Sequence, residues 1–416
     1  MPIFANGLQN YAMIVKFSIT NFGPIRETQT LDFEAEKSEH LENYYVHEIA
    51  GHRILKATIL FGANASGKTN VLKALDSLRR LATVPAASKT AEIDCEPFLM
   101  DRDSRQQPTG FEIDFIQSGN LYRYTLRLNR QCVIYERLRS QSRRRIVYTR
   151  TTDIDSQLTK IEFGEDYKVK NAVEAATLAS NTLWNETVLA GFTKTNMDHK
   201  ALLSVHNWFQ NYLEPMVHPK SSLNRTILDY IDRGIIDKEK FTELLRKADF
   251  NIGGVQIRKS EGEDELRLVH IGEDGSLVDD IRFASESLGT QRYFELAGIL
   301  YLLIARSYAF CIDEIESSIH PDLVKHFLLS FCTNATDSQI IMTTHNRELL
   351  NDKDIFRSDI ICFTEKGDDY ATRLYKLSDF GTDVVRNTTN VLNAYNAGKL
   401  GALPRLSDYF IDLKNE

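Results

Sequence analysis

The sequence predicts an α/β fold with a mixed β-sheet core, a flanking antiparallel sheet and a helical insertion. Three observations lead to this prediction. Apolar runs that end in polar residues, as buried parallel strands do, occupy residues 54–61, 309–314 and 340–345. Apolar and polar residues alternate between 111 and 150, which is typical of antiparallel strands. From about residue 171 to 247 the apolar residues change to helical spacing.

The first apolar run leads into the most informative stretch of the chain, residues 62–69. It has a glycine, four further residues, a second glycine, a lysine and a threonine, which is the pattern of a phosphate-binding loop. Helically spaced apolar residues follow it, so the loop stands between a strand and a helix, as the motif requires. Backbone N–H groups and the helix N-terminus would bind a triphosphate there. The alternative is a chance match on a surface turn. The predicted ATP-binding residues are Gly62, Ala63, Asn64, Ala65, Ser66, Gly67, Lys68 and Thr69.

Four side chains have individual predicted roles in this site. Lys68 would reach the β- and γ-phosphates of ATP, and the hydroxyl of Thr69 would bind Mg²⁺. Asp313 and Glu314 end the second apolar run, at the strand end where open α/β sheets bind ligands. We predict that Asp313 holds Mg²⁺ through water and that Glu314 orients and deprotonates the attacking water. The alternative is that the two acids cap a helix.

Two further features fit the same chemistry. His345 ends the third apolar run, and a neutral imidazole there could accept or donate a hydrogen bond at the γ-phosphate and sense hydrolysis. Ser287 and Gly289 open a long apolar helical stretch and would form a second anion-binding helix N-terminus. Because one chain needs only one phosphate loop, we predict that this second site contacts the γ-phosphate of another subunit. The alternatives are that His345 is an ordinary polar loop residue and that Ser287 is an ordinary helix N-cap.

The order of these motifs resembles the ABC ATPase clan of RecF, SMC and OLD proteins. Within the clan, the chain is most similar to the bacterial RloA/AbiL-type ATPases of phage-defence loci, a group that includes the ATPase of the PARIS system. Residues 13–25, 313–321 and 395–404 are similar to that group's first strand, acidic strand and C-terminal signature. The resemblance implies an ABC-type P-loop NTPase fold. The chain departs from the transporter-type signature at Leu288 and Thr290, and it has no evident glutamine switch loop.

The same resemblance implies a function. The chain would be an ATP-hydrolysing sensor or switch subunit of an anti-phage system, with composite ATP sites in a homodimer or higher homo-oligomer, and it would control a separate effector that is a nuclease or toxin. A RecF-like DNA-binding repair clamp remains the alternative. OLD proteins carry a Toprim nuclease domain after the ATPase, but only about seventy residues follow His345. We therefore expect any nuclease to be a separate chain.

We expect three parts along the chain. Residues 1–170 would form an N-terminal lobe with the phosphate loop and the antiparallel sheet, and residues 171–250 a helical insertion. Residues 251–416 would form a C-terminal lobe with the helix start, the acidic strand and the histidine. Within this lobe a hairpin is expected to turn at 261–264, between two alternating stretches.

Composition favours a cytoplasmic protein that does not enter a membrane. No run approaches the roughly 20 apolar residues of a membrane span, and no signal peptide is evident. The five cysteines lack metal-ligand spacing and fit reduced thiols, so Mg²⁺ at the nucleotide is the one metal we predict. Residues before Met13, where the strand pattern begins, could be an upstream extension, so translation would start at Met1 or Met13.

One β-rich segment concentrates arginine. The cluster comprises Arg137, Arg139, Arg143, Arg144, Arg145 and Arg150, with Tyr135 and Tyr148 beside them. Arginine and tyrosine together could bind the phosphate backbone of a nucleic acid, which makes DNA a candidate partner. The net charge of -8 argues against nucleic acid covering the whole surface but not against a local basic groove. The alternative is a solvated hairpin tip.

Overall fold

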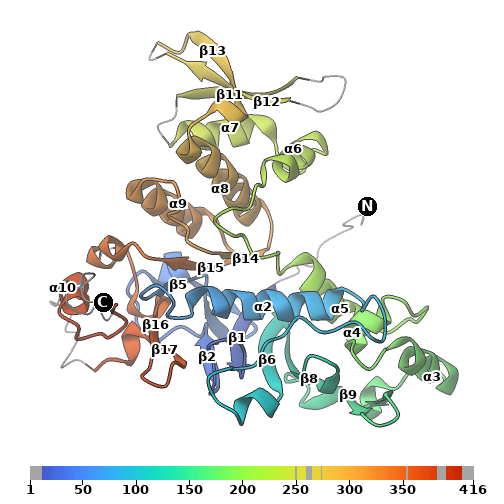
Figure 1. Ribbon diagram of the computed structural model, residues 1–416. Helices are drawn as coiled ribbons and strands as arrows, with labels where there is room; N and C mark the ends of the chain where they lie inside the picture. The colour runs from blue at the N-terminus through green and yellow to red at the C-terminus, as the bar shows by residue number, and fades with distance from the viewer. Residues whose placement is uncertain are drawn as a thin grey trace, which may run out of the picture.

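The computed structural model describes residues 12–248, 251–258, 265–272, 274–352, 355–381 and 390–404. The turn predicted at 261–264 and the start of the chain before Ala12 lie outside these residues. Within them, the molecule has a lower part that contains the two large sheets and an upper part of helices and a small sheet (Figure 1). None of the helices in the described ranges has the length and apolarity to span a membrane.

A five-stranded sheet, in the order β14-β15-β5-β16-β17, contains the strands of the second and third apolar runs and most of the first. The first run is not one strand, because it is divided at Lys56, and Ile54 and Leu55 belong to a strand of another sheet. The strands of the five-stranded sheet are β5 (Ala57–Phe61), β14 (Ala309–Ile312), β15 (Gln339–Thr344), β16 (Ile361–Lys366) and β17 (Thr372–Lys376). The first four strands in this order run parallel, and β17 is antiparallel to β16. Every residue of β5, β14 and β15 is buried. Because parallel strands end at the same edge of a sheet, the segments that follow these three strands meet there.

A seven-stranded antiparallel sheet flanks the first, in the order β10-β9-β8-β7-β6-β1-β2. The strands are β1 (Ala12–Thr20), β2 (Gln29–Asp32), β6 (Thr109–Gln117), β7 (Asn120–Leu128), β8 (Val133–Ser140), β9 (Arg145–Asp153) and β10 (Leu158–Phe163). A hairpin joins β6 to β7 through Ser118 and Gly119, both with positive φ, as a type I′ turn requires. The predicted α/β class, with a mixed core sheet and a flanking antiparallel sheet, is confirmed.

Two smaller sheets complete the strands. One pairs β3 (Val46–Ile49) with β4 (His52–Leu55), and the other has β11 (Ile252–Arg258), β12 (Glu265–Ile271) and β13 (Leu277–Arg282). The helices are α1 (Glu42–Tyr45), α2 (Lys68–Thr83), α3 (Ala172–Asn181), α4 (Val188–Phe192), α5 (Lys200–Asn211), α6 (Asn224–Asp232), α7 (Lys238–Arg246), α8 (Leu288–Ala305), α9 (Pro321–Asn334) and α10 (Val391–Asn396). In Figure 1, α6 to α8 and the three-stranded sheet form the upper part.

The helical stretch between β10 and β11 contributes to two hydrophobic cores rather than packing as one unit. Trp208 and Phe209 of α5 belong to the core beneath the antiparallel sheet, where α4 and α5 pack on α2. Phe241 and Leu245 of α7 belong to the other core, against α8. Helix α8 is apolar on nearly all sides, so its middle is buried in that core, while its first and last turns are partly exposed. The two cores therefore meet at the parallel sheet, which carries the candidate site.

Candidate nucleotide-binding site

The loop between β5 and α2 packs against the hairpin of β16 and β17. The Ser66 hydroxyl lies 2.6 Å from the Thr364 hydroxyl, and the Thr372 hydroxyl donates to the Ser66 carbonyl at 2.9 Å. Gly67 has a left-handed φ of 103°, and a Cβ there would lie 2.2 Å from Thr372 Oγ1. A Cβ at Gly62 would lie 2.4 Å from the Thr364 carbonyl oxygen. Both glycines of the predicted motif are thus required for this close approach of the loop to the hairpin.

Lys68 begins α2, and its side chain turns back into the loop. The buried Nζ donates to the carbonyls of Gly62 at 2.8 Å and Ala63 at 3.0 Å, and it lies 3.3 Å from Nδ1 of His345. Burial lowers the pKa of Lys68 to about 8, although the carboxylates of Asp313, Glu316 and Glu314 oppose this shift. A phosphate bound in the loop would favour the charged ammonium as these carboxylates do, but more strongly, and would raise the pKa of Lys68.

Asp313 follows β14 and lies directly opposite Thr69. The Thr69 hydroxyl donates to both carboxylate oxygens of Asp313, at 3.0 and 3.1 Å. The Thr343 hydroxyl of β15 donates to the same carboxylate at 2.7 Å, which fixes its orientation. No cluster of three or more His, Cys, Asp or Glu that could hold a metal occurs in the part of the chain that the structure describes. One carboxylate and one hydroxyl are nevertheless the oxygen ligands that Mg²⁺ uses beside nucleotide phosphates, so these residues fit Mg²⁺.

Glu314 and His345 face each other across the ends of β14 and β15. Their Oε1 and Nε2 atoms are 3.7 Å apart, and the Glu314 carboxylate is 43% exposed. The backbone of Glu314 has a φ of 45°, a left-handed value that non-glycine residues adopt mainly where contacts enforce it. The Thr343 hydroxyl accepts the Glu314 N–H at 2.8 Å. Helix α9 begins only at Pro321, so the two acids do not cap a helix.

Three residues that the sequence analysis did not single out hold this cluster together. Thr343 binds both acids, Thr372 binds the loop, and Glu316 accepts the N–H of His345 at 2.5 Å. Thr343 carried a signal in the sequence, because a hydroxyl in a buried strand needs a hydrogen-bond partner. Thr372 and Glu316 carried none, since their contacts depend on how distant segments pack.

The C-terminal segment with α10 lies against the start of the loop. The N–H of Ala63 donates to the carbonyl of Ala402 at 3.1 Å. Two tyrosine hydroxyls hold this segment, with Tyr395 donating to the carbonyl of Ala402 at 2.9 Å and Tyr375 to that of Leu400 at 2.8 Å. The stretch that resembles the family's C-terminal signature therefore supports the phosphate loop.

Ser287 and Gly289 lie apart from this cluster. Ser287 is the N-cap of α8, and its hydroxyl accepts the Thr290 N–H at 3.1 Å. Ser287 is exposed, and Leu288 beside it is 71% exposed. A Cβ at Gly289 would lie 3.0 Å from the carbonyl oxygen of Ser318, which follows the acidic pair. Over the described ranges, no hydrogen bond or ion pair joins Ser287 to the loop or to the acids. The structure brings together the other predicted site residues but not these two.

The arginine cluster is divided between the interior and the surface. Arg150 is fully buried and donates to backbone carbonyls of the segment before α4, and buried Tyr148 donates to Glu136 at 2.5 Å. The predicted nucleic-acid contact is therefore wrong for these two residues, which are structural. Arg143 and Arg144 are exposed at the turn between β8 and β9. Exposure of these two side chains is what both a nucleic-acid contact and a solvated hairpin tip require.

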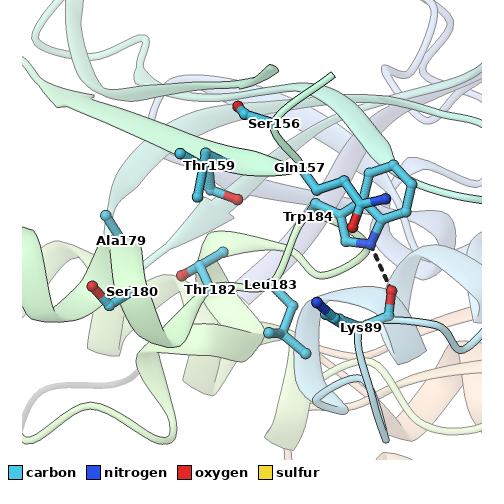
Figure 2. A pocket seen from close by; sticks show the side chains of 10 residues that line it. Lys89, Ser156, Gln157, Thr159, Ala179, Ser180, Thr182, Leu183 and Trp184 are labelled. Atoms are coloured by element: carbon cyan, nitrogen blue, oxygen red, sulfur yellow. Dashed lines mark hydrogen bonds between the residues drawn. The ribbon is translucent and has the colours of Figure 1, made fainter. Parts of the chain in front are cut away.

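A cleft of 370 Å³ lies beyond the C-terminal end of α2 (Figure 2). Its lining comes from the loop after α2, the turn between β9 and β10 with the start of β10, and α3 with the segment that follows it. Trp184 and Lys89 lie side by side there, and the indole N–H of Trp184 donates to the Lys89 carbonyl at 2.6 Å. No predicted site residue lines this cleft, so it is separate from the phosphate loop.

The fold and the site together define a P-loop nucleotide-binding α/β protein. A family model described as "AAA domain, putative AbiEii toxin, Type IV TA system" matches residues 57–351, a span that contains the loop, the start of α8, both acids and His345. The chain belongs to this family. Membership confirms the predicted ATPase class, with the nucleotide binding that this class implies.

Solved structures of SMC heads are similar to this chain at low sequence identity. The SMC head domain from Thermotoga maritima is 12% identical, with a TM-score of 0.42 over 87% of this chain and 98% of that chain. An Smc head bound to the C-terminal winged-helix domain of ScpA is 12% identical, with a TM-score of 0.46 over 87% and 97%. An Smc head with an extended coiled coil, bound to the C-terminal domain of ScpA derived from Pyrococcus furiosus, is 11% identical, with a TM-score of 0.43 over 88% and 96%. No curated protein matches the chain.

Proposed function

We propose that the chain hydrolyses ATP to ADP and phosphate with Mg²⁺ and acts as the sensor or switch subunit of a bacterial anti-phage system. The observation that carries the enzymatic part is the convergence of Thr69, Asp313 and Glu314 at one edge of the parallel sheet. Nucleotide hydrolysis needs oxygen ligands for Mg²⁺, which Thr69 and Asp313 supply, and an accessible carboxylate beside the phosphate loop, which is Glu314.

Each group has a defined part in this proposal. The loop N–H groups and Lys68 bind the phosphates, while Thr69 and Asp313 hold Mg²⁺, which supplies charge neutralisation when bound. Glu314 orients the attacking water and accepts its proton, because its carboxylate is exposed where Asp313 is buried and engaged by two hydroxyls. His345 contacts the γ-phosphate from beside Glu314 and Lys68.

The second half of the site comes from another subunit in this proposal. Ser287 is exposed at the N-terminus of the 18-residue helix α8, where N–H groups and the helix dipole favour an anion. Because it has no contact with its own loop in the described chain, Ser287 with Gly289 would cover the γ-phosphate of a partner copy. Bound ATP would then stabilise a homodimer or a higher homo-oligomer, and hydrolysis would release it. The chain would then have two states, associated with ATP bound and separated after hydrolysis, and a switch requires two such states.

A separate effector protein completes the proposal. The family description names a toxin of a toxin–antitoxin system, and the sequence resembles ATPases of phage-defence loci. Both favour a nuclease or toxin held in the cytoplasm and released or activated when the nucleotide state changes.

A pair of variants purified from the native host tests the switch. Glu314→Gln should retain ATP, and Lys68→Ala should not bind it. The two variants therefore hold the protein in its ATP-bound and nucleotide-free states. After nuclease treatment to remove bridging nucleic acid, mass spectrometry should find the same effector enriched with one variant and depleted with the other. An effector recovered equally with both variants, or with neither, would contradict the switch.

The exposed tip between β8 and β9 supports a second candidate, a DNA-binding clamp like RecF. Arg143 and Arg144 stand there in solvent and could neutralise phosphates. If the clamp is right, Glu314→Gln with ATP should bind duplex DNA, and a double Arg143→Ser, Arg144→Ser change should weaken that binding and its salt dependence. Arg102→Ser, at an exposed arginine elsewhere, is the matched control.

A further inference from the structure

The turn between β16 and β17 is held beside the phosphate loop. Thr372, at its end, donates its hydroxyl to the Ser66 carbonyl at 2.9 Å and its N–H to the Pro24 carbonyl at 2.8 Å. Asp369 in the turn accepts from Arg26 at 2.8 Å, which also ties the turn to the segment between β1 and β2. One contact therefore joins the turn to the phosphate loop, and two join it to the segment between β1 and β2.

The order of strands sets the direction of a bound nucleotide, given the function proposed above. Asp313, Glu314 and His345 follow β14 and β15, so the terminal phosphate lies on that side of β5. Strands β16 and β17 lie on the other side of β5. A triphosphate that crosses the loop with its γ-phosphate beside Glu314 therefore directs its nucleoside toward the turn of β16 and β17.

Tyr370 occupies this turn with its ring largely in solvent. The side chain is 56% exposed, and the backbone φ is 62°, in the left-handed region that aromatic residues seldom adopt. Such conformations persist where the surroundings enforce them and are concentrated at ligand sites. Here the Tyr370 N–H donates to the Gly367 carbonyl at 3.0 Å, and Lys366 Nζ lies 4.8 Å from the ring centroid.

We propose that Tyr370 is the platform on which the base of the bound nucleotide stacks. The turn that carries the ring lies on the nucleoside side of β5, and its contacts with Ser66, Pro24 and Arg26 fix its position. Lys366 lies over the ring and would strengthen the site for an anionic ligand. Stacking uses the face of a base rather than its edge, so the site takes both ATP and GTP.

Titration calorimetry with ATP, GTP and inorganic tripolyphosphate separates the base contact from the phosphate contact. Tyr370→Asn removes the ring and tolerates the left-handed backbone, while Tyr370→Phe keeps the ring as the matched control. We expect Tyr370→Asn to weaken ATP and GTP by about tenfold and to leave tripolyphosphate unchanged, because stacking is worth about 1–3 kcal/mol per base. Tyr370→Phe should bind all three ligands as the parental chain does.

The ligand pattern distinguishes the failure of this inference from that of the proposed function. If Tyr370→Asn keeps the parental affinity for all three ligands, the base does not stack on Tyr370, and the assignment of the phosphate loop is unaffected. Equal weakening of all three ligands by Tyr370→Asn would show a distorted loop and would also overturn the inference. A parental chain that binds neither ATP nor tripolyphosphate would overturn the proposed function, and the stacking role with it.

Discussion

The phosphate loop and the start of α8 both present N–H groups of a helix N-terminus to solvent, but their surroundings differ. At the loop, hydrogen bonds of 2.7–3.3 Å join Lys68 to His345, Thr69 to Asp313, and Asp313 to β15. At the start of α8, Ser287 contacts only its own first turn in the described chain. One half-site is thus preorganised within the chain. In our proposal the other half-site acquires its ligand only when two chains meet.

The largest effect we expect comes from the preorganised half. Lys68→Ala removes the ammonium that offsets the phosphate charge, so direct titration should detect no ATP binding. Thermal melting should show that the variant is folded, because the buried lysine costs desolvation free energy in the absence of phosphate. Tight ATP binding by the folded variant would refute the assignment of residues 62–69 as the nucleotide site.

A smaller effect is expected from Glu314→Gln, because in the described part of the chain Glu314 has no hydrogen bond to the phosphate loop, and the loss of its carboxylate should slow hydrolysis without preventing ATP binding. Glu314→Gln should bind ATP with parental affinity and release phosphate at least roughly 10²-fold more slowly, since the amide cannot accept the proton of the attacking water. Phosphate release at saturating ATP measures this. Glu348→Gln changes an exposed carboxylate on the nearby 3₁₀ helix Arg347–Asn351 and should keep the parental rate. If Glu314→Gln turns over at the parental rate, Glu314 is not the general base.

The preorganised half was largely predictable from the sequence because it depends on local pattern. Buried parallel strands are continuous apolar runs, and the polar residues that end them must meet at one sheet edge. This reasoning located the loop, both acids and His345 before any contact was known. It could not locate the contacts of Thr372 with Ser66 or of Ala402 with Ala63, because these join segments that are about 300 residues apart.

The arginine cluster shows where local sequence pattern gives a wrong prediction of exposure. Charge alone predicted exposed side chains, yet Arg150 is buried because backbone carbonyls of the segment before α4 supply its partners. Nothing in the sequence around Arg150 indicates those carbonyls, which come from residues 183–186. A buried charge of this kind becomes visible only when the tertiary structure shows what pairs with it.

Mixing two inactive variants tests whether the start of α8 acts across subunits. Lys68→Ala disables a loop, and Ser287→Arg disables the facing half-site, so each variant alone should lose hydrolysis. In an equimolar mixture, half of the dimers are mixed, and each has one intact site. Phosphate release should therefore return to roughly a quarter of the parental rate. If Ser287→Arg alone hydrolyses ATP at the parental rate, the chain acts as a monomer, and the proposed switch by nucleotide-dependent association is refuted.

The smallest expected effect is a pH dependence confined to the preorganised half. Burial holds the pKa of Lys68 at about 8 without nucleotide, and bound phosphate raises it, so ATP binding takes up a proton above that pH. Affinity should therefore fall by about threefold between pH 7.5 and 8.5, the change in the protonated fraction of a group with that pKa. Lys68→Arg keeps its charge over this range and should show a flat profile in the same titration. The Ser287 hydroxyl does not titrate there, so ATP-driven association measured at saturating nucleotide should not change. A parental profile as flat as that of Lys68→Arg would mean that the Lys68 ammonium remains fully charged in the free loop.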